Sequence, residues 1–363
     1  YPDPLLAFSD MMASRVRRDP SPPILLPEVV HNIAPHLAYP DLLRFLTCCR
    51  ELYAYKDFDL DVSSEILCSS EALSLAWSHI HRFRFHFSVD RCNQQMFDNL
   101  MSLPMVSLVV RPPTVEPPLR AISSVGMCKG LRQLRLLYST GSHIDDLSPL
   151  AQCSCLSMLT IHNASSLMDI SPLASCRQLR VLELRRCERI SDVSSFQSAT
   201  CPLEAMTLQG CLQLRDISPL AALSFLCSLD LSRCSALESV SPLGACAELR
   251  SLVVTGCSML SDVQGLAKCS LLHTIFATGC LSLSDVRALA KCRALRALHL
   301  NKCPSIRDVS VLGLCESLRI LNLRCSGAIV VPQRQHLRVE FDLSPPYTPR
   351  SKECWGFSSP NWR

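Results

Sequence analysis

One cassette of about 23 residues recurs between Cys176 and Cys315 with almost no change in length. Each copy closes on the phrase Leu-x-Leu-x-x-Cys or a close variant of it, as in residues 182–187 and 298–303. The closing cysteines of the six clear copies are Cys187, Cys211, Cys234, Cys257, Cys280 and Cys303. A period in the low twenties indicates a solenoid, in which each repeat buries its apolar face against its neighbours.

The cassette predicts one strand and one short turn of helix per repeat. Leu182 and Leu184 are two residues apart, so in a strand they point to the same side, and we expect that side to be the core. Strands one repeat apart then pair as a parallel sheet. In the connector at residues 169–174, Ser171 is expected as the N-cap and Pro172 as the first helical residue. The aspartate that recurs before each connector is expected to bond local backbone N–H groups.

These features resemble the leucine-rich repeat family, in a cysteine-containing variety. The resemblance implies an α/β solenoid, a horseshoe with a parallel sheet and short convex helical turns. Extending the register to both sides gives about eleven strands, over residues 81–343. The inward pairs outside the clear copies are Phe83 with Phe85, Val106 with Leu108, Leu134 with Leu136, Leu159 with Ile161, and Leu321 with Leu323. Alternating apolar residues in 336–343 indicate a closing strand.

The chain has 22 cysteines, and most of them recur with the repeat. A second row lies six residues before the phrase, at Cys128, Cys153, Cys176, Cys246, Cys269, Cys292 and Cys315. Cysteine fits a buried bend as a small apolar residue with a weak donor, so we expect structural thiols. The spacings of zinc sites do not occur, and no metal is predicted. Many free thiols indicate a reducing compartment, cytoplasmic or nuclear.

Composition and motifs argue against several classes of function. The net charge is only +4, which gives no strong indication of nucleic-acid binding. No run of 18 apolar residues indicates a membrane span. No nucleophile elbow, phosphate loop or metalloprotease motif occurs, so we expect no enzyme, no catalytic residues and no cofactor. The chain starts with Tyr1, which indicates a trimmed fragment.

Residues 24–80 differ from the repeats and are expected to be helical. Pro27 opens one apolar helix and Asp41 caps a second, and residues 63–80 suggest a third. The order Leu-Pro-Glu, Asp-Leu and Cys-Arg in residues 24–66 resembles an F-box, although Pro35 interrupts the first helix. The alternative is an N-terminal helical cap, which solenoids use to cover their first repeat.

The F-box resemblance implies a function. Proteins that join this module to leucine-rich repeats are substrate-recognition subunits of SCF-type cullin ubiquitin ligases. The module binds the adaptor subunit, and through it cullin, while the repeats bind a protein substrate. The adaptor-binding residues it implies are Leu26, Pro27, Val30, Ile33, Leu37, Leu42 and Phe45. The alternative is a leucine-rich repeat scaffold, or a subunit of a large assembly, without a ligase.

The outward positions of the strands are the candidate partner-binding surface. They are expected to line the concave face of the solenoid, where arginine and aromatic side chains favour protein contact. They are Arg135, Tyr138, His162, Glu183, Arg185, Arg186, Gln209, Asp230, Arg233, Phe276, His299, Asn301, Lys302 and Arg324. Residues 1–23 are expected to be a flexible lead-in and residues 344–363 a disordered tail that regulates binding.

Overall fold

The computed structural model describes residues 57–61, 84–90, 94–101, 105–111, 119, 121–138, 142–332 and 337–340. The predicted adaptor-binding residues lie outside these ranges, as do the lead-in, the tail and the helix expected at 63–80.

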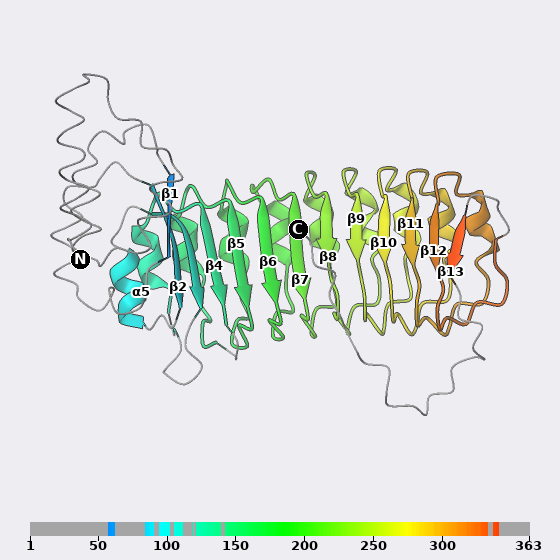
Figure 1. Cartoon of the computed structure of the whole chain (residues 1–363), viewed down its shortest axis with the longest axis horizontal. Helices are drawn as coiled ribbons and strands as arrows, with labels where there is room; N and C mark the ends of the chain where they lie inside the picture. Colours follow the sequence, from blue (N-terminus) through cyan, green and yellow to red (C-terminus); the bar gives the residue numbers. More distant parts are fainter. Residues whose placement is uncertain are drawn as a thin grey trace, which may run out of the picture.

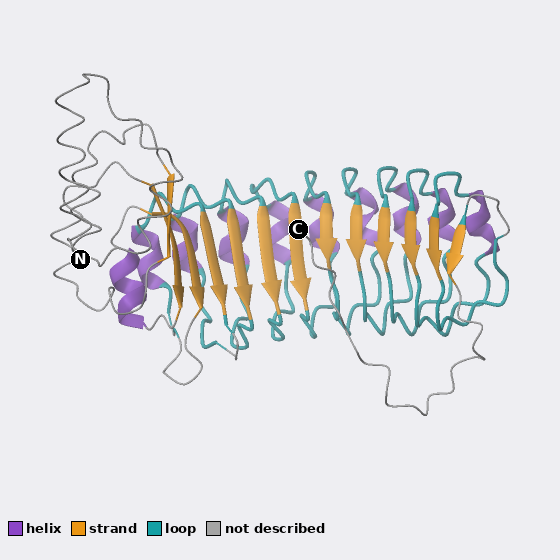
Figure 2. Cartoon of the chain, viewed as in Figure 1, coloured by secondary structure: helices purple, strands orange, loops and turns teal. Residues whose placement is uncertain are grey.

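The described residues form a solenoid with one long parallel sheet on its front and short helical turns behind it (Figures 1 and 2). The sheet runs from β1 to β13 in sequence order, and every neighbouring pair is parallel. The strands are β1 Asp57–Asp61, β2 Arg84–Asp90, β3 Met105–Arg111, β4 Gln133–Leu137, β5 Met158–His162, β6 Val181–Arg185, β7 Ala205–Gln209, β8 Ser228–Asp230, β9 Ser251–Val253, β10 Thr274–Phe276, β11 Ala297–His299, β12 Ile320–Asn322 and β13 Arg338–Glu340. The predicted parallel ladder and its closing strand are therefore confirmed.

One α-helix and nine 3-10 turns connect these strands within the described ranges. They are α5 Gln94–Met101, η4 Ser123–Met127, η5 Ser148–Gln152, η6 Ser171–Ser175, η7 Ser194–Ser198, η8 Ser218–Ala222, η9 Ser241–Ala245, η10 Gln264–Lys268, η11 Arg287–Lys291 and η12 Ser310–Leu314. A 23-residue repeat leaves room for little more than one such turn, which explains why longer helices do not form in the regular part.

The core is a stack of nearly identical layers. In the repeat around β6, Leu173, Leu179, Leu182, Leu184 and Ile190 are all fully buried. Each buried leucine contributes on the order of 2 kcal/mol relative to exposure. The layers stack because each strand aligns its two inward residues with those of the next strand.

The caps of the 3-10 turns differ from the prediction. Ser171 is the first residue of η6 rather than its N-cap, and the preceding Ile170 makes no side-chain cap. The capping oxygen comes from Asp169, whose Oδ1 accepts the N–H of Ser171 at 2.8 Å. The same bond, at 2.7 to 2.9 Å, recurs from Asp146, Asp192, Asp216, Asp262, Asp285 and Asp308. The prediction that these aspartates are turn residues is confirmed.

The predicted register is wrong by two residues at β3 and by four at β2, where Phe87 pairs with Leu108 and Val89 with Val110. Leu108 pairs with Leu134 and Val110 with Leu136, and both Leu108 and Val110 are fully buried. Val106, expected to be inward, is only half-buried. A shift of two residues keeps the same side of the strand facing the core, so alternation alone does not detect it.

Two elements near the start of the solenoid were not predicted. Strand β1 lies inside the range assigned to the helical module and pairs with β2 over its whole length. Helix α5 buries Phe97, Leu100 and Met101, which follow the three- and four-residue spacing of a helix face.

Candidate functional site: the exposed face of the sheet

The candidate site is the sheet face, which we define as the side of β4–β13 turned away from the 3-10 turns. Two rows of side chains cross it. The central row is Arg135, Thr160, Glu183, Thr207, Asp230, Val253, Phe276, His299, Asn322 and Glu340, which are aligned in register. The second row lies two residues further along each strand, and comprises Leu137, His162, Arg185, Gln209, Ser232, Thr255, Thr278, Asn301 and Arg324.

A third row lies where the chain leaves each strand, and we call it the left-handed ridge. Its residues have positive φ angles, which turn the chain sharply away from the sheet. They are Asn163, Arg186, Gly210, Arg233, Gly256, Gly279, Lys302 and Cys325, with φ between 54° and 77°. Backbone N–H groups of the ridge bond carbonyls of the next strand, as from Arg186 to Gln209 and from Gly256 to Thr278. The ridge therefore follows the sheet from repeat to repeat.

A charged cluster occupies the face at β5–β7. Glu183 accepts bonds from Arg185 and from Thr160, the latter at 3.4 Å, and lies 3.5 Å from His162 Nε2. Arg185 also donates to Gln209 at 3.2 Å. The imidazole of His162, whose Nε2 lies 3.5 Å away, and the charge of Arg185 hold the pKa of Glu183 at about 2, against the opposing effect of burial. Glu183 is thus ionised at neutral pH and paired with Arg185.

A second polar cluster closes the far end of the face. Glu340 accepts a bond from Asn322 at 2.8 Å and forms ion pairs with Arg338 at 3.1 Å and Arg324 at 3.8 Å. Next to it, the rings of His299 and Phe276 stack with centroids 4.6 Å apart. Burial lowers the pKa of His299, which favours its neutral form.

Between these clusters lies a charge-free window on β9 and β10. It is made of Val253, Thr255, Phe276 and Thr278, all half-buried, and is bounded on the ridge by Gly256 and Gly279. The window presents methyl groups, hydroxyls and one aromatic ring. Such a surface gives up little hydration when a partner covers it.

Apart from Tyr138, the predicted site residues fall into five groups. His162, Glu183, Arg185 and Gln209 come together in the β5–β7 cluster, and Phe276 stacks on His299. Asp230 accepts bonds from the N–H and hydroxyl of Ser232. The exposed residues Arg186, Arg233 and Lys302 lie on the ridge. The remaining ones are Arg135 in the central row, and Asn301 and Arg324 in the second row.

Tyr138 is a correction to the predicted set. Its side chain is 5% exposed and belongs to the core. It continues the inward alternation of Leu134 and Leu136, and it is not among the described residues with a left-handed backbone. Arg186 has the same alternation but a φ of 54°, and this turns its side chain outward.

Sequence reasoning missed several residues of the face. Thr160, Asn322, Arg338 and Glu340 all take part in the polar clusters. The signal was present, because Arg338 and Glu340 alternate with the inward Val339 in the closing strand. Extending the outward rows to that strand would have found them.

The two cysteine rows are structural, as predicted. All thirteen row cysteines have buried side chains, and most donate the thiol hydrogen to a carbonyl of the preceding repeat. Cys257 bonds Leu231 O at 3.1 Å, and Cys292 bonds Leu266 O at 3.2 Å. Burial raises the pKa of Cys257 and of Cys292 to about 12, so these thiols are protonated and unreactive at neutral pH.

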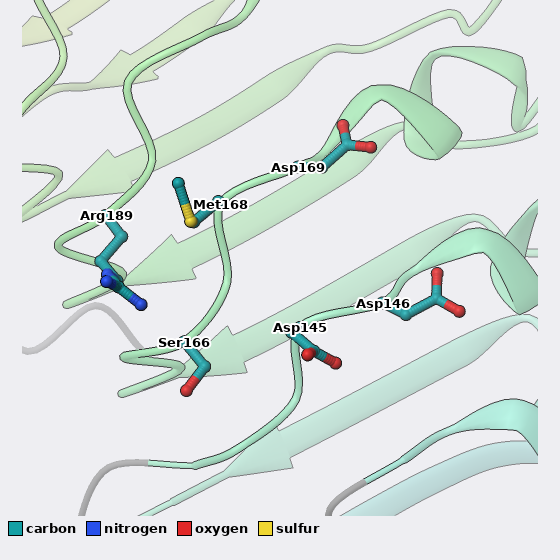
Figure 3. Close-up of a pocket in the computed structure, with 6 residues that line it drawn as sticks. All are labelled: Asp145, Asp146, Ser166, Met168, Asp169 and Arg189. Atoms are coloured by element: carbon teal, nitrogen blue, oxygen red, sulfur yellow. The ribbon is translucent and has the colours of Figure 1, made fainter.

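A pocket also lies on the loops that follow β4, β5 and β6. It is lined by Asp145, Asp146, Ser166, Met168, Asp169 and Arg189 (Figure 3). The carboxylates of Asp146 and Asp169 point toward the turns that follow them and cap these turns. Bonds from Ser148 lower the pKa of Asp146. Two of its three acidic groups, Asp146 and Asp169, are therefore used by the fold as turn caps.

Two features are absent from the described part of the chain. No group of three or more His, Cys, Asp or Glu side chains there is arranged to hold a metal ion. No helix in these ranges is long and apolar enough to cross a bilayer.

Known proteins resemble this chain in structure. No protein-family model and no curated protein matches its sequence. An internalin from Listeria monocytogenes superposes with a TM-score of 0.56 and 18% identity, covering 84% of this chain and 94% of that one. Internalin C2 of the same organism superposes with a TM-score of 0.40 and 20% identity, covering 69% of this chain and 84% of the internalin chain. A leucine-rich repeat protein of Leptospira interrogans superposes with a TM-score of 0.38 and 12% identity, covering 80% of this chain and 91% of that one. The first likeness, together with the parallel ladder, shows a fold of the leucine-rich repeat type.

Proposed function

We propose that this chain is a non-catalytic protein-binding solenoid, and that the sheet face recognises a protein partner. The observation that carries the proposal is the charge-free window between two internally paired polar clusters. Glu183 and Glu340, the carboxylates at the two polar ends, are each paired with arginine side chains of the face, so these charges need no ligand. The half-buried Val253 and Phe276 supply apolar contact area at its centre. Interface energy is concentrated in such central, partly apolar positions.

A photo-crosslinking experiment tests the binding face. Benzoylphenylalanine is introduced into the full chain at Thr278 in the window, or at the exposed Ala245 at the end of η9 as a control. Irradiation in an extract of the source cells is expected to give a discrete crosslinked protein band from position 278 and none from position 245. Equal labelling from both positions, or none from position 278, would contradict the proposal.

The finer proposal is a substrate receptor of an SCF-type cullin ligase. It is supported by the resemblance of residues 24–66 to an F-box, and those residues carry the predicted adaptor contacts. The test is a pull-down of purified adaptor subunit by the full chain, beside a Leu26→Ala/Ile33→Ala variant. A Leu5→Ala/Leu6→Ala variant in the lead-in is the control. If adaptor binding is lost only in the Leu26→Ala/Ile33→Ala variant, the ligase-receptor proposal is supported. If the folded native chain does not bind the adaptor, that proposal is wrong and the non-ligase scaffold is the better description.

A reducing compartment, cytoplasm or nucleus, is part of the proposal. Its support is the packing of the cysteine rows as buried thiols, most of which donate an S–H hydrogen bond to a backbone carbonyl, as Cys257 and Cys292 illustrate. Oxidation of such buried donors would remove a hydrogen bond and add volume to a filled core.

A further inference from the structure

Three of the eight ridge positions hold long cationic side chains. Arg186, Arg233 and Lys302 have φ angles of 54°, 62° and 56°, and all three side chains are exposed. We propose that Arg233 and Lys302, with Arg186 beyond them, bind acidic side chains of the protein partner on either side of the charge-free window. This inference rests on the proposed function and names the chemistry of its partner.

The first argument is the backbone at these positions. A left-handed conformation is unfavourable for any residue with a side chain other than the few that bond locally. Gly210, Gly256 and Gly279 occupy the same place in other repeats, with φ of 75° to 77°. Glycine is therefore sufficient to form this turn. A strained residue that the turn does not require suggests a role for its side chain.

The second argument is the charge balance along this edge. Among the described residues of the second row and the ridge there are five cations and no carboxylate; the cations are Arg185, Arg186, Arg233, Lys302 and Arg324. Two of these cations, Arg185 and Arg324, are paired with carboxylates of the central row, and the third carboxylate of that row, Asp230, accepts bonds from Ser232. Glu183 is bound by His162 and Arg185, and Glu340 by its own arginines. The edge therefore has a positive potential that attracts acidic groups.

The third argument is spacing. Arg233 follows β8 and Lys302 follows β11, so three strand spacings of about 4.8 Å separate them, about 14 Å in all. An extended peptide rises about 3.3 Å per residue, so acidic residues four or five apart reach both cations. The residues between them then pass Gly256 and Gly279, beside the charge-free window. The matching ligand is a protein segment with acidic ends and an apolar centre.

The same geometry disfavours a nucleic acid. Phosphates repeat at every nucleotide and need a continuous cationic track. Here the track is interrupted at Gly256 and Gly279, and the ring of Phe276 is already stacked against His299.

The test uses a fluorescein-labelled peptide with two glutamates, four apolar residues and two glutamates, and measures anisotropy with the full chain. The variants are Arg233→Gly/Lys302→Gly and Arg233→Asn/Lys302→Asn. Glycine and asparagine are chosen because both tolerate the left-handed backbone conformation. A Lys268→Ser/Lys291→Ser variant removes the same charge from exposed sites on the 3-10 turns. We expect at least tenfold weaker binding in both ridge variants, native binding in the control, and no binding of a peptide with glutamine for glutamate. The ridge variants should melt no lower than the native chain.

Several outcomes would overturn the inference. They are equal binding by native and ridge variants, equal binding of the glutamine peptide, or tighter ridge-dependent binding of a 12-nucleotide single-stranded DNA. No peptide binding with a retained crosslink at Thr278 overturns the acidic ligand and leaves the proposed function intact. If neither peptide binding nor a crosslink at Thr278 is observed, the proposed function is overturned as well.

Discussion

Replacing Cys257 by alanine tests whether the cysteine rows stabilise the solenoid through packing. The side chain is fully buried, and its Sγ lies 3.1 Å from Leu231 O. Removing the sulfur costs at least the transfer free energy of a methylene, about 0.8 kcal/mol, plus a term for the cavity. Leu231 O also accepts the N–H of Cys234 at 3.1 Å, so it keeps one partner. The lost thiol bond therefore adds only about 0.5 kcal/mol.

We expect the Cys257→Ala substitution to lower the free energy of unfolding by about 2 kcal/mol. The assay is equilibrium urea unfolding followed by circular dichroism. Since repeats contact only their neighbours, native-state hydrogen exchange of β9 and β10 measures the same change locally. Cys155→Ala is the matched control, because Cys155 is exposed and its loss should change stability by less than about 0.5 kcal/mol. Equal effects of the two substitutions would refute the packing argument.

Three further predictions concern the turns and the charged cluster. The pKa of Glu183 falls from 4.5 to about 2 on folding, so its contribution is complete above pH 4.5 and is lost as the pH falls toward 2. We expect a loss of about 2 kcal/mol over that window, absent in Glu183→Gln, and identical acid titrations of both proteins would contradict it. Gly265→Ala places a Cβ 1.9 Å from Ser241 O, whereas Gly313→Ala meets only a side chain at 3.3 Å. Thermal melting should show a loss of more than about 2 kcal/mol for the first and less than half of that for the second, and similar melting temperatures would be inconsistent with this. Asp169→Ala removes a turn-capping bond and should cost about 1 kcal/mol in urea unfolding, and a change near zero would argue against capping.

The period of the sequence determined most of the architecture. Inward leucines two residues apart, repeated every 23 residues or so, leave a parallel ladder as the simplest way to bury them. The turn role of Asp169 and the burial of Cys257 also followed from local chemistry, because each repeats in the same place. When the same residue type recurs at one position of every repeat, a single structural role must account for all copies. Local chemistry then identifies that role reliably.

Only the tertiary structure decided what happens where the repetition fails. Leu108 and Val110 form the inward pair of β3 because pairing with β4 selects the register. The alternation of apolar residues does not reveal a register shift of two residues, because the same side of the strand still faces the core. Tyr138 is buried and Arg186 exposed at equivalent places in the alternation, because only Arg186 has a left-handed backbone. Pairing across repeats, as between Glu183 and His162, depends on which side chains the ladder brings together. The sequence by itself determined the repeating unit, whereas contacts between units decided the register, the ridge and the surface that a partner meets.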